Sequence, residues 1–250
     1  MNSVLSQNWR KCDINPGDTV LVHSSLKRTL QTHNTTPQAV MESFLEAVGP
    51  DGTVLFPLFN FDFTKGVRFD IRSTPSQMGA LTETARLHPD AVRSGHPIYS
   101  FAIIGPQAQK FNVDNYSGYG PDSPFAILRQ LDGKIGVLDL EDQNSMTLYH
   151  HIEEMHGVPY RFHKKFTGQY TDANGVTSER TYGLFVRDLD KGVMTNVNPM
   201  GEILWENGLY HGDRPKQGIG LRTISANAMY DAVSEVIEAG RALGLLYSIK

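Results

Sequence analysis

One segment near the middle of the chain carries the densest group of side chains able to do chemistry. It reads Thr147-Leu148-Tyr149-His150-His151-Ile152-Glu153-Glu154-Met155-His156. If the segment is helical, His150 and Glu153 lie one turn apart on the same face. A carboxylate beside an imidazole raises its basicity and holds one tautomer, so the other ring nitrogen is free to accept a proton. His151 and Glu154 have the same spacing, so spacing alone does not choose between the two pairs.

Two other interpretations of this segment stay open. It could be an ordinary solvated helix face with surface ion pairs. It could also hold zinc through His150, His151 or His156 with a carboxylate, since neutral imidazoles bind zinc and His-x-x-Glu occurs in metal-binding bundles. The His-Glu-x-x-His order of zinc peptidases is absent, and a third ligand would have to come from elsewhere, such as His96 or His23. A zinc-dependent hydrolase is therefore an alternative.

A second group of polar residues follows the first apolar run of the sequence. His23-Ser24-Ser25-Leu26 comes at the end of a predicted buried strand. Ligands of open α/β sheets bind beyond the carboxyl ends of the strands, where hydroxyls and backbone N–H groups hold an anion or an acyl oxygen. Further along, Tyr119-Gly120-Pro121-Asp122-Ser123-Pro124 predicts a rigid turn in which Ser123 caps the next helix.

Alternating strand and helix patterns predict the elements that position these groups. Short β-branched and apolar runs predict strands at 19–23, 53–56, 99–104 and 134–138, while periodic apolar residues predict helices at 37–48, 76–87, 145–156 and 224–246. The order strand, helix, strand at the start of the chain predicts a parallel pair joined by a crossover helix. The fold class is therefore α/β, with a mixed, largely parallel central sheet and flanking helices.

The sequence pattern of the second half predicts an antiparallel hairpin. Residues 161–170 and 178–187 flank Asp172-Ala173-Asn174-Gly175, a turn sequence typical of a β-hairpin. We interpret the chain as one domain, 1–250, with a core of 15–160 and 218–250 and an antiparallel insert at about 161–217. The edge of this hairpin could pair with a strand of a second copy or be covered within the chain, so a homodimer is one alternative.

Composition excludes several classes of protein. The chain has 250 residues, with 23 Lys and Arg against 27 Asp and Glu, so its net charge of −4 lacks the basic character of a nucleic-acid binder. Its one cysteine, Cys12, excludes an intramolecular disulfide and a cysteine-built metal site. No apolar run approaches the ~18 residues of a membrane span. We expect a cytoplasmic protein with no nucleic-acid or membrane partner.

Seven segments, in order, resemble the antibiotic N-acetyltransferase family of the aminoglycoside 3-N-acetyltransferase type. The resemblance covers roughly residues 18–165 and, more loosely, Gly218–Arg222. The segments are His23-Ser24-Ser25-Leu26, Gly52-Thr53-Val54-Leu55-Phe56-Pro57, Met78-Gly79-Ala80-Leu81-Thr82-Glu83, Arg93-Ser94-Gly95-His96-Pro97, Ser100-Phe101-Ala102-Ile103-Ile104-Gly105, Tyr119-Gly120-Pro121-Asp122-Ser123-Pro124 and Thr147-Leu148-Tyr149-His150-His151-Ile152-Glu153-Glu154.

The resemblance implies an enzyme that transfers an acetyl group from acetyl-CoA to a primary amine. The Thr-x-x-His-x-x-Glu pattern of the family falls on Thr147, His150 and Glu153, which favours His150 over His151. The resemblance also implies direct transfer in a ternary complex, with the His–Glu pair as general base and no metal. Its implied cofactor contacts fall on His23, Ser24, Ser25, Tyr119 and Ser123.

The expected acceptor site departs from the family. Relatives hold the amine substrate with an acidic residue after the Gly-Thr-x-x-x-Pro strand, for which Asp62, beside Asn60, is the nearest candidate. Aminoglycosides are polycations whose sites need several carboxylates, yet Phe59–Phe63 offers one acid among aromatic residues. We therefore expect another amino sugar or a small amine in preference to an aminoglycoside antibiotic. A non-catalytic module that binds a CoA ester or a sugar, and a CoA hydrolase or transferase on the same scaffold, remain alternatives.

Overall fold

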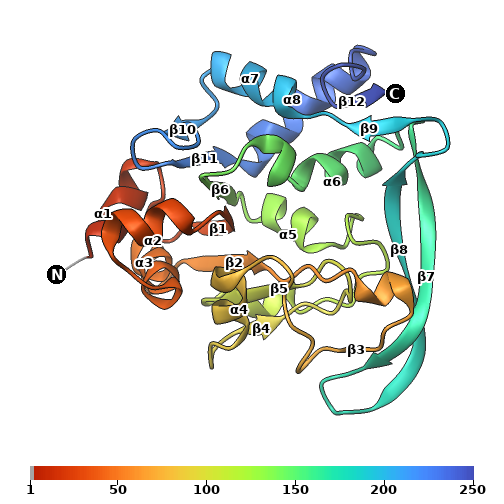
Figure 1. The fold of residues 1–250 in the computed structure, drawn as a ribbon, viewed down its shortest axis with the longest axis horizontal. Coiled ribbons are helices and arrows are strands. Elements are labelled where there is room, and N and C mark those ends of the chain that lie inside the picture. The colour runs from red at the N-terminus through yellow and green to blue at the C-terminus, as the bar shows by residue number, and fades with distance from the viewer. Residues whose placement is uncertain (1–2) are drawn as a thin grey trace.

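A seven-stranded sheet forms the centre of the computed structural model, which describes residues 3–250 (Figure 1). Its strand order is β10-β11-β6-β1-β2-β5-β4. The strands are β1 (Thr19–Ser24), β2 (Thr53–Pro57), β4 (Val92–Arg93), β5 (Phe101–Ile104), β6 (Lys134–Leu138), β10 (His211–Gly212) and β11 (Leu221–Ser225). The strands predicted from the first half of the sequence all belong to this sheet.

The centre of the sheet is parallel and its flanks are antiparallel. β1 pairs in parallel with both β2 and β6, while β11, β5, β10 and β4 each join antiparallel to a neighbour. Only β11 and β5 therefore run against the other strands of this sheet, which confirms the mixed, largely parallel arrangement. The predicted crossover is also confirmed, because α3 (Pro37–Val48) lies between the parallel strands β1 and β2.

Alternation along the central strands divides the apolar core between the two faces of the sheet. Val20 and Val22 pack on the face covered by α1 (Val4–Lys11), α3 and α4 (Ala80–Arg86), whereas Leu21 packs on the other face. That second face is covered by α5 (Pro124–Gln130), α6 (Leu148–Met155) and α8 (Ala226–Glu238). The carboxyl ends of β1 and β6 thus lie beside α6, the helix that carries the His and Glu residues.

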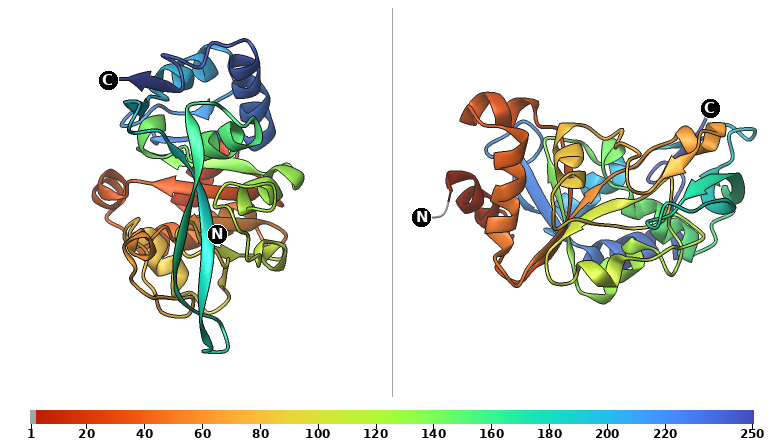
Figure 2. Two further views of the ribbon diagram at one scale, coloured as in Figure 1. Left: turned by 90° about the vertical axis from the view of Figure 1, so that its right-hand side faces the viewer. Right: turned by 90° about the horizontal axis from the view of Figure 1, so that it is seen from below.

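The second half of the chain contains the expected hairpin. β7 (Arg161–Thr171) and β8 (Thr177–Arg187) pair in antiparallel register along their full lengths, and β3 (Phe69–Asp70) adds to β7. The hairpin stands at one end of the sheet as a long twisted ribbon (Figure 2). Its turn uses Gly175 at φ +83°, a left-handed conformation that glycine adopts without steric cost. The base of this ribbon lies beside α6.

The helix predicted at 224–246 is wrong at both ends. Residues 221–225 form strand β11, and the helix α8 covers only Ala226–Glu238. The Ser225 side chain caps this helix by accepting from the Ala228 N–H at 3.3 Å, so the strand passes directly into the helix. Gly240, at φ +69°, follows the helix end. The apolar residues of β11 continue directly into those of α8, so the sequence pattern does not separate the two elements.

Several other elements complete the described chain. They are α2 (Lys27–His33), α7 (Asn198–Glu206), the strands β9 (Val193–Thr195) and β12 (Tyr247–Ile249), which pair with each other, and the short 3-10 helices η1 (Asp62–Lys65), η2 (Ala108–Phe111) and η3 (Asp142–Asn144). No helix within residues 3–250 is long and apolar enough to cross a membrane.

A buried ionic group fixes the loop that leads from β6 into α6. The Asp142 carboxylate accepts hydrogen bonds from Arg222 at 2.7 Å, Tyr149 at 2.9 Å and Tyr210 at 2.7 Å. Arg222 and Asp142 are both buried away from water, so each charge is stabilised by the other. The group joins β11, α6 and the segment after α7 at one point, next to the start of the helix that carries His150.

We predict that Asp142→Ala destabilises the protein by about 3–5 kcal/mol, because it leaves the buried Arg222 charge unpaired. Denaturant unfolding followed by circular dichroism measures this change. Glu141→Ala removes the neighbouring carboxylate, which is exposed, and should cost under ~1 kcal/mol. Equal losses for the two variants would contradict a special role for the Asp142 group.

Candidate active site

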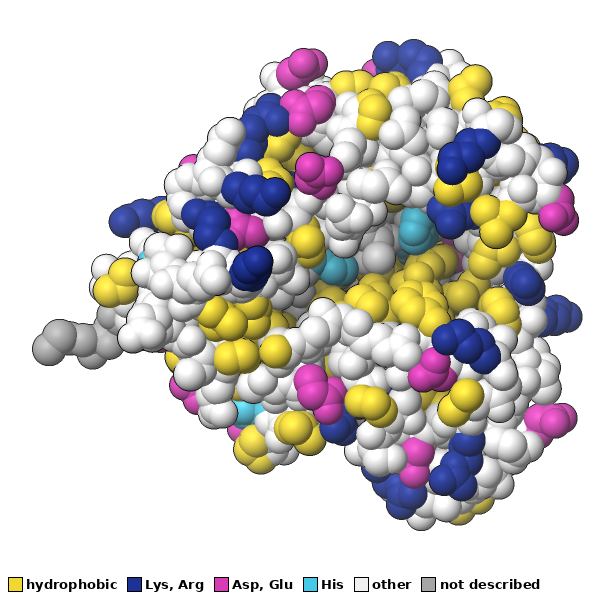
Figure 3. Space-filling model, viewed as in Figure 1, with side chains coloured by type: hydrophobic (Ala, Val, Ile, Leu, Met, Phe, Trp, Pro, Cys, Tyr) yellow, Lys and Arg dark blue, Asp and Glu magenta, His cyan; other side chains and the backbone are white. Residues whose placement is uncertain are grey.

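Two cavities meet at the end of the sheet where β1 finishes and α6 begins. The larger has a volume of about 610 Å³ and lies between α6 and the hairpin, and the smaller, of about 200 Å³, lies between His23 and the loop 142–147. They share four lining residues, Phe61, Tyr99, His150 and Thr195. The space-filling view shows the same hollow, with histidine side chains on its wall and an apolar floor (Figure 3). His150 therefore stands where the two cavities join.

Helix α6 turns its two histidines in different directions. His150 faces the cavities, whereas His151 is fully buried and its Nδ1 lies 2.6 Å from the carbonyl oxygen of Tyr119. Glu154 accepts a hydrogen bond from the Ser117 hydroxyl at 2.8 Å and does not bind His151. The ambiguity of the sequence is resolved by this orientation, since His150 reaches the cavities, with Glu153 buried behind it, and His151 does not.

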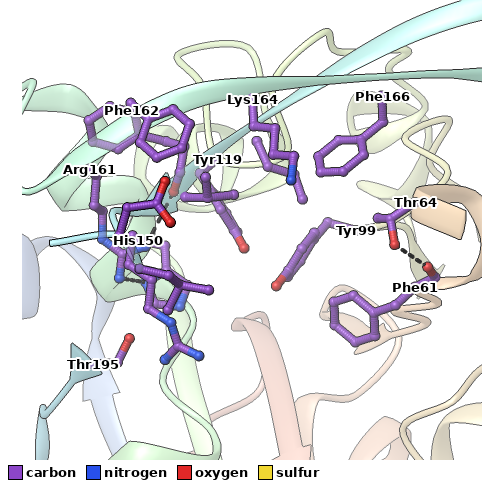
Figure 4. A pocket seen from close by; sticks show the side chains of 16 residues that line it. Phe61, Thr64, Tyr99, Tyr119, His150, Arg161, Phe162, Lys164, Phe166 and Thr195 are labelled. Atoms are coloured by element: carbon purple, nitrogen blue, oxygen red, sulfur yellow. Dashed lines mark hydrogen bonds between the residues drawn. The ribbon is translucent and has the colours of Figure 1, made fainter. Parts of the chain in front are cut away.

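His150, Glu153 and Arg161 form one network. His150 Nδ1 lies 3.1 Å from Glu153 Oε2 and 3.0 Å from an Arg161 terminal nitrogen, and Arg161 Nε lies 2.7 Å from the same carboxylate oxygen. A protonated Nδ1 donates to Glu153, and an unprotonated Nδ1 accepts from Arg161. In the first tautomer Nε2 has a free lone pair. Figure 4 shows His150 and Arg161 side by side at the wall of the larger cavity.

Burial and charge together set the protonation of this network. Burial and the Arg161 charge lower the pKa of His150, and the opposing effect of Glu153 is smaller. Burial alone would raise the pKa of Glu153, but Arg161 and His150 hold it below its usual value. The imidazole is therefore neutral and the carboxylate ionised near neutral pH. In the tautomer that carries Nδ1–H, the neutral ring can accept a proton at Nε2.

Polar side chains from the end of β1 and from neighbouring loops line the cavities around His150. The Thr147 hydroxyl lies 3.4 Å from His23 Nε2 at the smaller cavity. Burial and then the charge of Arg222 lower the pKa of His23 to about 3, so this ring is neutral. Tyr119 and Tyr99 lie with ring centroids 4.6 Å apart, and the close view shows their hydroxyl ends facing the larger cavity (Figure 4). His23, Thr147 and Tyr119 are thus brought together with His150.

The three serines expected at the site are placed differently. Ser24 and Ser25 lie at the end of β1, partly buried, and the Ser25 N–H donates to the Leu138 carbonyl at 2.8 Å. Ser123 precedes α5 as expected, but its side chain does not cap the helix. Its buried hydroxyl has no hydrogen-bond partner among residues 3–250, and it is not among the residues that line the two cavities. Their cofactor contacts stay predictions.

The side chains of Asn60 and Asp62 hold the local loop. Asn60 donates to the Pro75 carbonyl at 2.9 Å and accepts from the Asp62 N–H at 2.9 Å. The Asp62 carboxylate accepts from Gln77 at 2.9 Å and from Lys65 at 3.2 Å. Neither residue lines the two cavities, where Phe61 and Thr64 from the same segment stand instead. Their predicted substrate-binding role remains a prediction.

Sequence reasoning missed the residues that the hairpin contributes. Arg161, Lys164 and Arg187 line the larger cavity, and each comes from a strand predicted only as an insert. Within the sequence, Arg161 is eleven positions from His150 and lies beyond the end of α6 at Met155, so helix spacing does not connect the two. The alternation of β7 was visible, but its placement against α6 depends on tertiary packing. Among residues 3–250, no group of three His, Cys, Asp or Glu side chains is arranged to hold a metal ion.

The fold and the cleft define an α/β protein in which an imidazole held by a buried carboxylate lies at the carboxyl ends of the central strands. The chain belongs to the family described as Aminoglycoside 3-N-acetyltransferase, which matches residues 21–238. This bears out the resemblance found in the sequence segments.

Similar proteins include aminoglycoside N(3)-acetyltransferase IV of Salmonella sp, which is 31% identical over 169 residues. That alignment covers 62% of this chain and 63% of the relative, a little under two thirds of its length. Aminoglycoside N(3)-acetyltransferase VIII of Streptomyces fradiae is 28% identical, with 71% of this chain and 67% of the relative aligned.

Solved structures show the same fold over nearly the whole chain. The aminoglycoside acetyltransferase AAC(3)-Xa has a TM-score of 0.78 at 25% identity, with 94% of this chain and 91% of that chain covered. A structure described as AAC-IIIb binary with CoASH has a TM-score of 0.80 at 22% identity and covers 94% of this chain and 95% of that chain. The expected α/β fold class is therefore confirmed.

We predict that Arg161→Gln raises the pKa of His150, because a positive charge that disfavours the imidazolium is removed. Titration of the His150 ring by NMR measures the change. Arg161→Lys keeps the charge and should keep the pKa low, and Arg180→Gln, which removes an exposed arginine paired with Asp114, should leave it unchanged. A His150 pKa that does not rise in Arg161→Gln would contradict the network.

Proposed function

We propose that this chain is a CoA-dependent N-acetyltransferase that acetylates a primary amine of an amino sugar or another small amine. One observation carries the proposal: His150 stands where two cavities meet, with its Nδ1 held by a buried carboxylate. Family membership supports the class of reaction. Two cavities that meet at one base are what a direct transfer between two bound substrates requires.

The smaller cavity fits the acyl donor. Its volume of about 200 Å³ suits a thin chain such as pantetheine, and it is lined by His23, Thr147 and the loop 142–147. Bound acetyl-CoA would supply an acetyl group activated as a thioester. The similar fold of AAC-IIIb was solved with CoASH, which supports a CoA site on this scaffold. The larger cavity, of about 610 Å³, is left for the amine.

His150 would act as the general base. An ammonium group has no lone pair, so His150 Nε2 removes a proton before the nitrogen attacks the thioester carbonyl carbon. A carbon–nitrogen bond then forms and the carbon–sulfur bond breaks. The proton held by His150 passes to the departing thiolate, and the nitrogen loses its second proton to solvent as the amide forms. Glu153 accepts from Nδ1–H and stabilises the imidazolium. No covalent acyl-enzyme is needed, and the buried Cys12 takes no part.

The Thr147 hydroxyl is the proposed donor to the developing oxyanion. It lines the smaller cavity at the start of α6, 3.4 Å from His23 Nε2. The Ser25 N–H, another donor expected at this position, is engaged by the Leu138 carbonyl at 2.8 Å. A hydroxyl placed where negative charge develops stabilises the transition state more than it stabilises the neutral thioester, and so it lowers the barrier. Thr147, and not the Ser25 N–H, is therefore the oxyanion donor of this mechanism.

We predict that His150→Ala lowers acetyl transfer by about 10²–10⁴-fold, the usual contribution of a general base. Thiol release from acetyl-CoA with a panel of primary amines measures turnover, and calorimetry checks that acetyl-CoA still binds. Glu154→Gln, on the same helix but bound to Ser117, is the matched control and should keep most activity.

Three results would overturn the proposed function. Near wild-type turnover in His150→Ala removes His150 from the mechanism. Thiol release that does not need an amine indicates a CoA hydrolase. Acetyl-CoA binding with no turnover on any amine indicates a non-catalytic binding module.

A further inference from the structure

The larger cavity has cations that no carboxylate neutralises. Three basic residues line it, and one of these, Arg161, is committed to the buried Glu153 at 2.7 Å. Lys164 and Arg187 form no ion pair with any residue in the described range 3–250, although Lys164 Nζ lies 5.6 Å from the centroid of the Phe166 ring. The close view shows the Lys164 side chain reaching from the hairpin over the cavity (Figure 4). These two charges are free to bind an anion.

Carboxylates are scarce in the same space. Within the described structure, Asp190 is the acid among the residues that line the larger cavity, and Asp142 is the acid of the smaller one. Asp142 is already committed to Arg222, Tyr149 and Tyr210. One free carboxylate can hold one ammonium group, but it does not match a polycation. The cavity thus combines a place for a single amine with two cations for negative charge.

Aromatic rings supply the remaining surface of the larger cavity. Its lining includes Phe61, Tyr99, Phe162, Phe166 and Phe185. Phe61 and Phe162 are 36% and 47% exposed, so these two rings are open to a ligand that enters the cavity. Planar rings of this kind stack on nucleobases and on the apolar faces of sugars. Figure 3 shows Lys and Arg side chains near this apolar rim.

Both cations come from the hairpin. Lys164 lies on β7 and Arg187 is the last residue of β8, and both line the larger cavity. Arginine and lysine both bind phosphate oxygens through charge-assisted hydrogen bonds.

We infer that the acceptor is an amino sugar joined to a nucleoside diphosphate, with its phosphates bound by Lys164 and Arg187 and its base or sugar against the aromatic rings. This assignment rests on the proposed function, because it names the substrate class of the same site. The amine then lies toward His150 and the nucleotide toward the hairpin.

Acetyl-CoA also carries phosphates, so the experiment must separate the two ligands. The enzyme is first saturated with CoA, and UDP, dTDP and GDP are then titrated by calorimetry, with the free nucleosides as controls for the phosphates. The variants are Lys164→Gln and Arg187→Gln. Lys165→Gln is the matched control, because this neighbouring exposed lysine does not line the cavity.

We expect at least one nucleoside diphosphate to bind the CoA-loaded enzyme more tightly than its nucleoside. Each cavity variant should weaken that binding by on the order of tenfold, the effect of losing a charged hydrogen bond, while Lys165→Gln changes it less than twofold. UDP-glucosamine should also be acetylated with a lower KM than glucosamine, and this advantage should shrink in Lys164→Gln and Arg187→Gln.

Other outcomes would overturn the inference. Equal binding by all variants, or no binding of any nucleoside diphosphate to CoA-loaded enzyme, removes the phosphate site. Weaker binding of CoA in place of the nucleotides assigns the two cations to the acyl donor. Nucleotide binding through Lys164 and Arg187 without acetyl transfer to any amine would instead overturn the proposed function while the nucleotide site stands.

Discussion

The site depends on keeping one buried carboxylate charged. Glu153 has a side chain only 1% exposed, and a carboxylate so far from water would take up a proton without partners. Arg161 and His150 provide those partners at 2.7 Å and 3.1 Å. This pairing fixes the imidazole and also joins α6 to the first residue of β7. The orientation of the His150 ring and the attachment of the hairpin therefore rest on the same interaction.

The same interaction explains how the cleft is divided. α6 starts from the loop held by Asp142, so Thr147 and His150 are anchored to the core of the sheet. The hairpin, in contrast, touches this centre through Arg161 and carries its remaining side chains outward over the larger cavity. One wall of the cleft is thus anchored to the core, and the other is a two-stranded ribbon. Thr147 and His150 belong to the anchored wall.

Much of the fold could be predicted from local patterns. The strands 19–23, 53–56 and 134–138 were evident because they are short apolar runs bounded by turns, and the Asp172–Gly175 turn marked the hairpin. β11 was missed because its apolar residues run directly into those of α8. For the site, a family pattern selected His150, and the structure shows why His151 differs: it packs under the Tyr119 carbonyl. Arg161, Lys164 and Arg187 were not predicted, since contacts between a hairpin and a distant helix depend on tertiary packing.

The ribbon form of β7 and β8 has a consequence for how such proteins diverge. In the middle of β7, the alternate residues Phe162, Lys164 and Phe166 line the cavity, while Lys165 between them does not. Exchanges at these alternate positions would change the charge and shape offered to a ligand without moving the helix that carries the imidazole. A scaffold built this way can acquire new molecular preferences by point changes in one hairpin, while the helix with its imidazole is inherited intact.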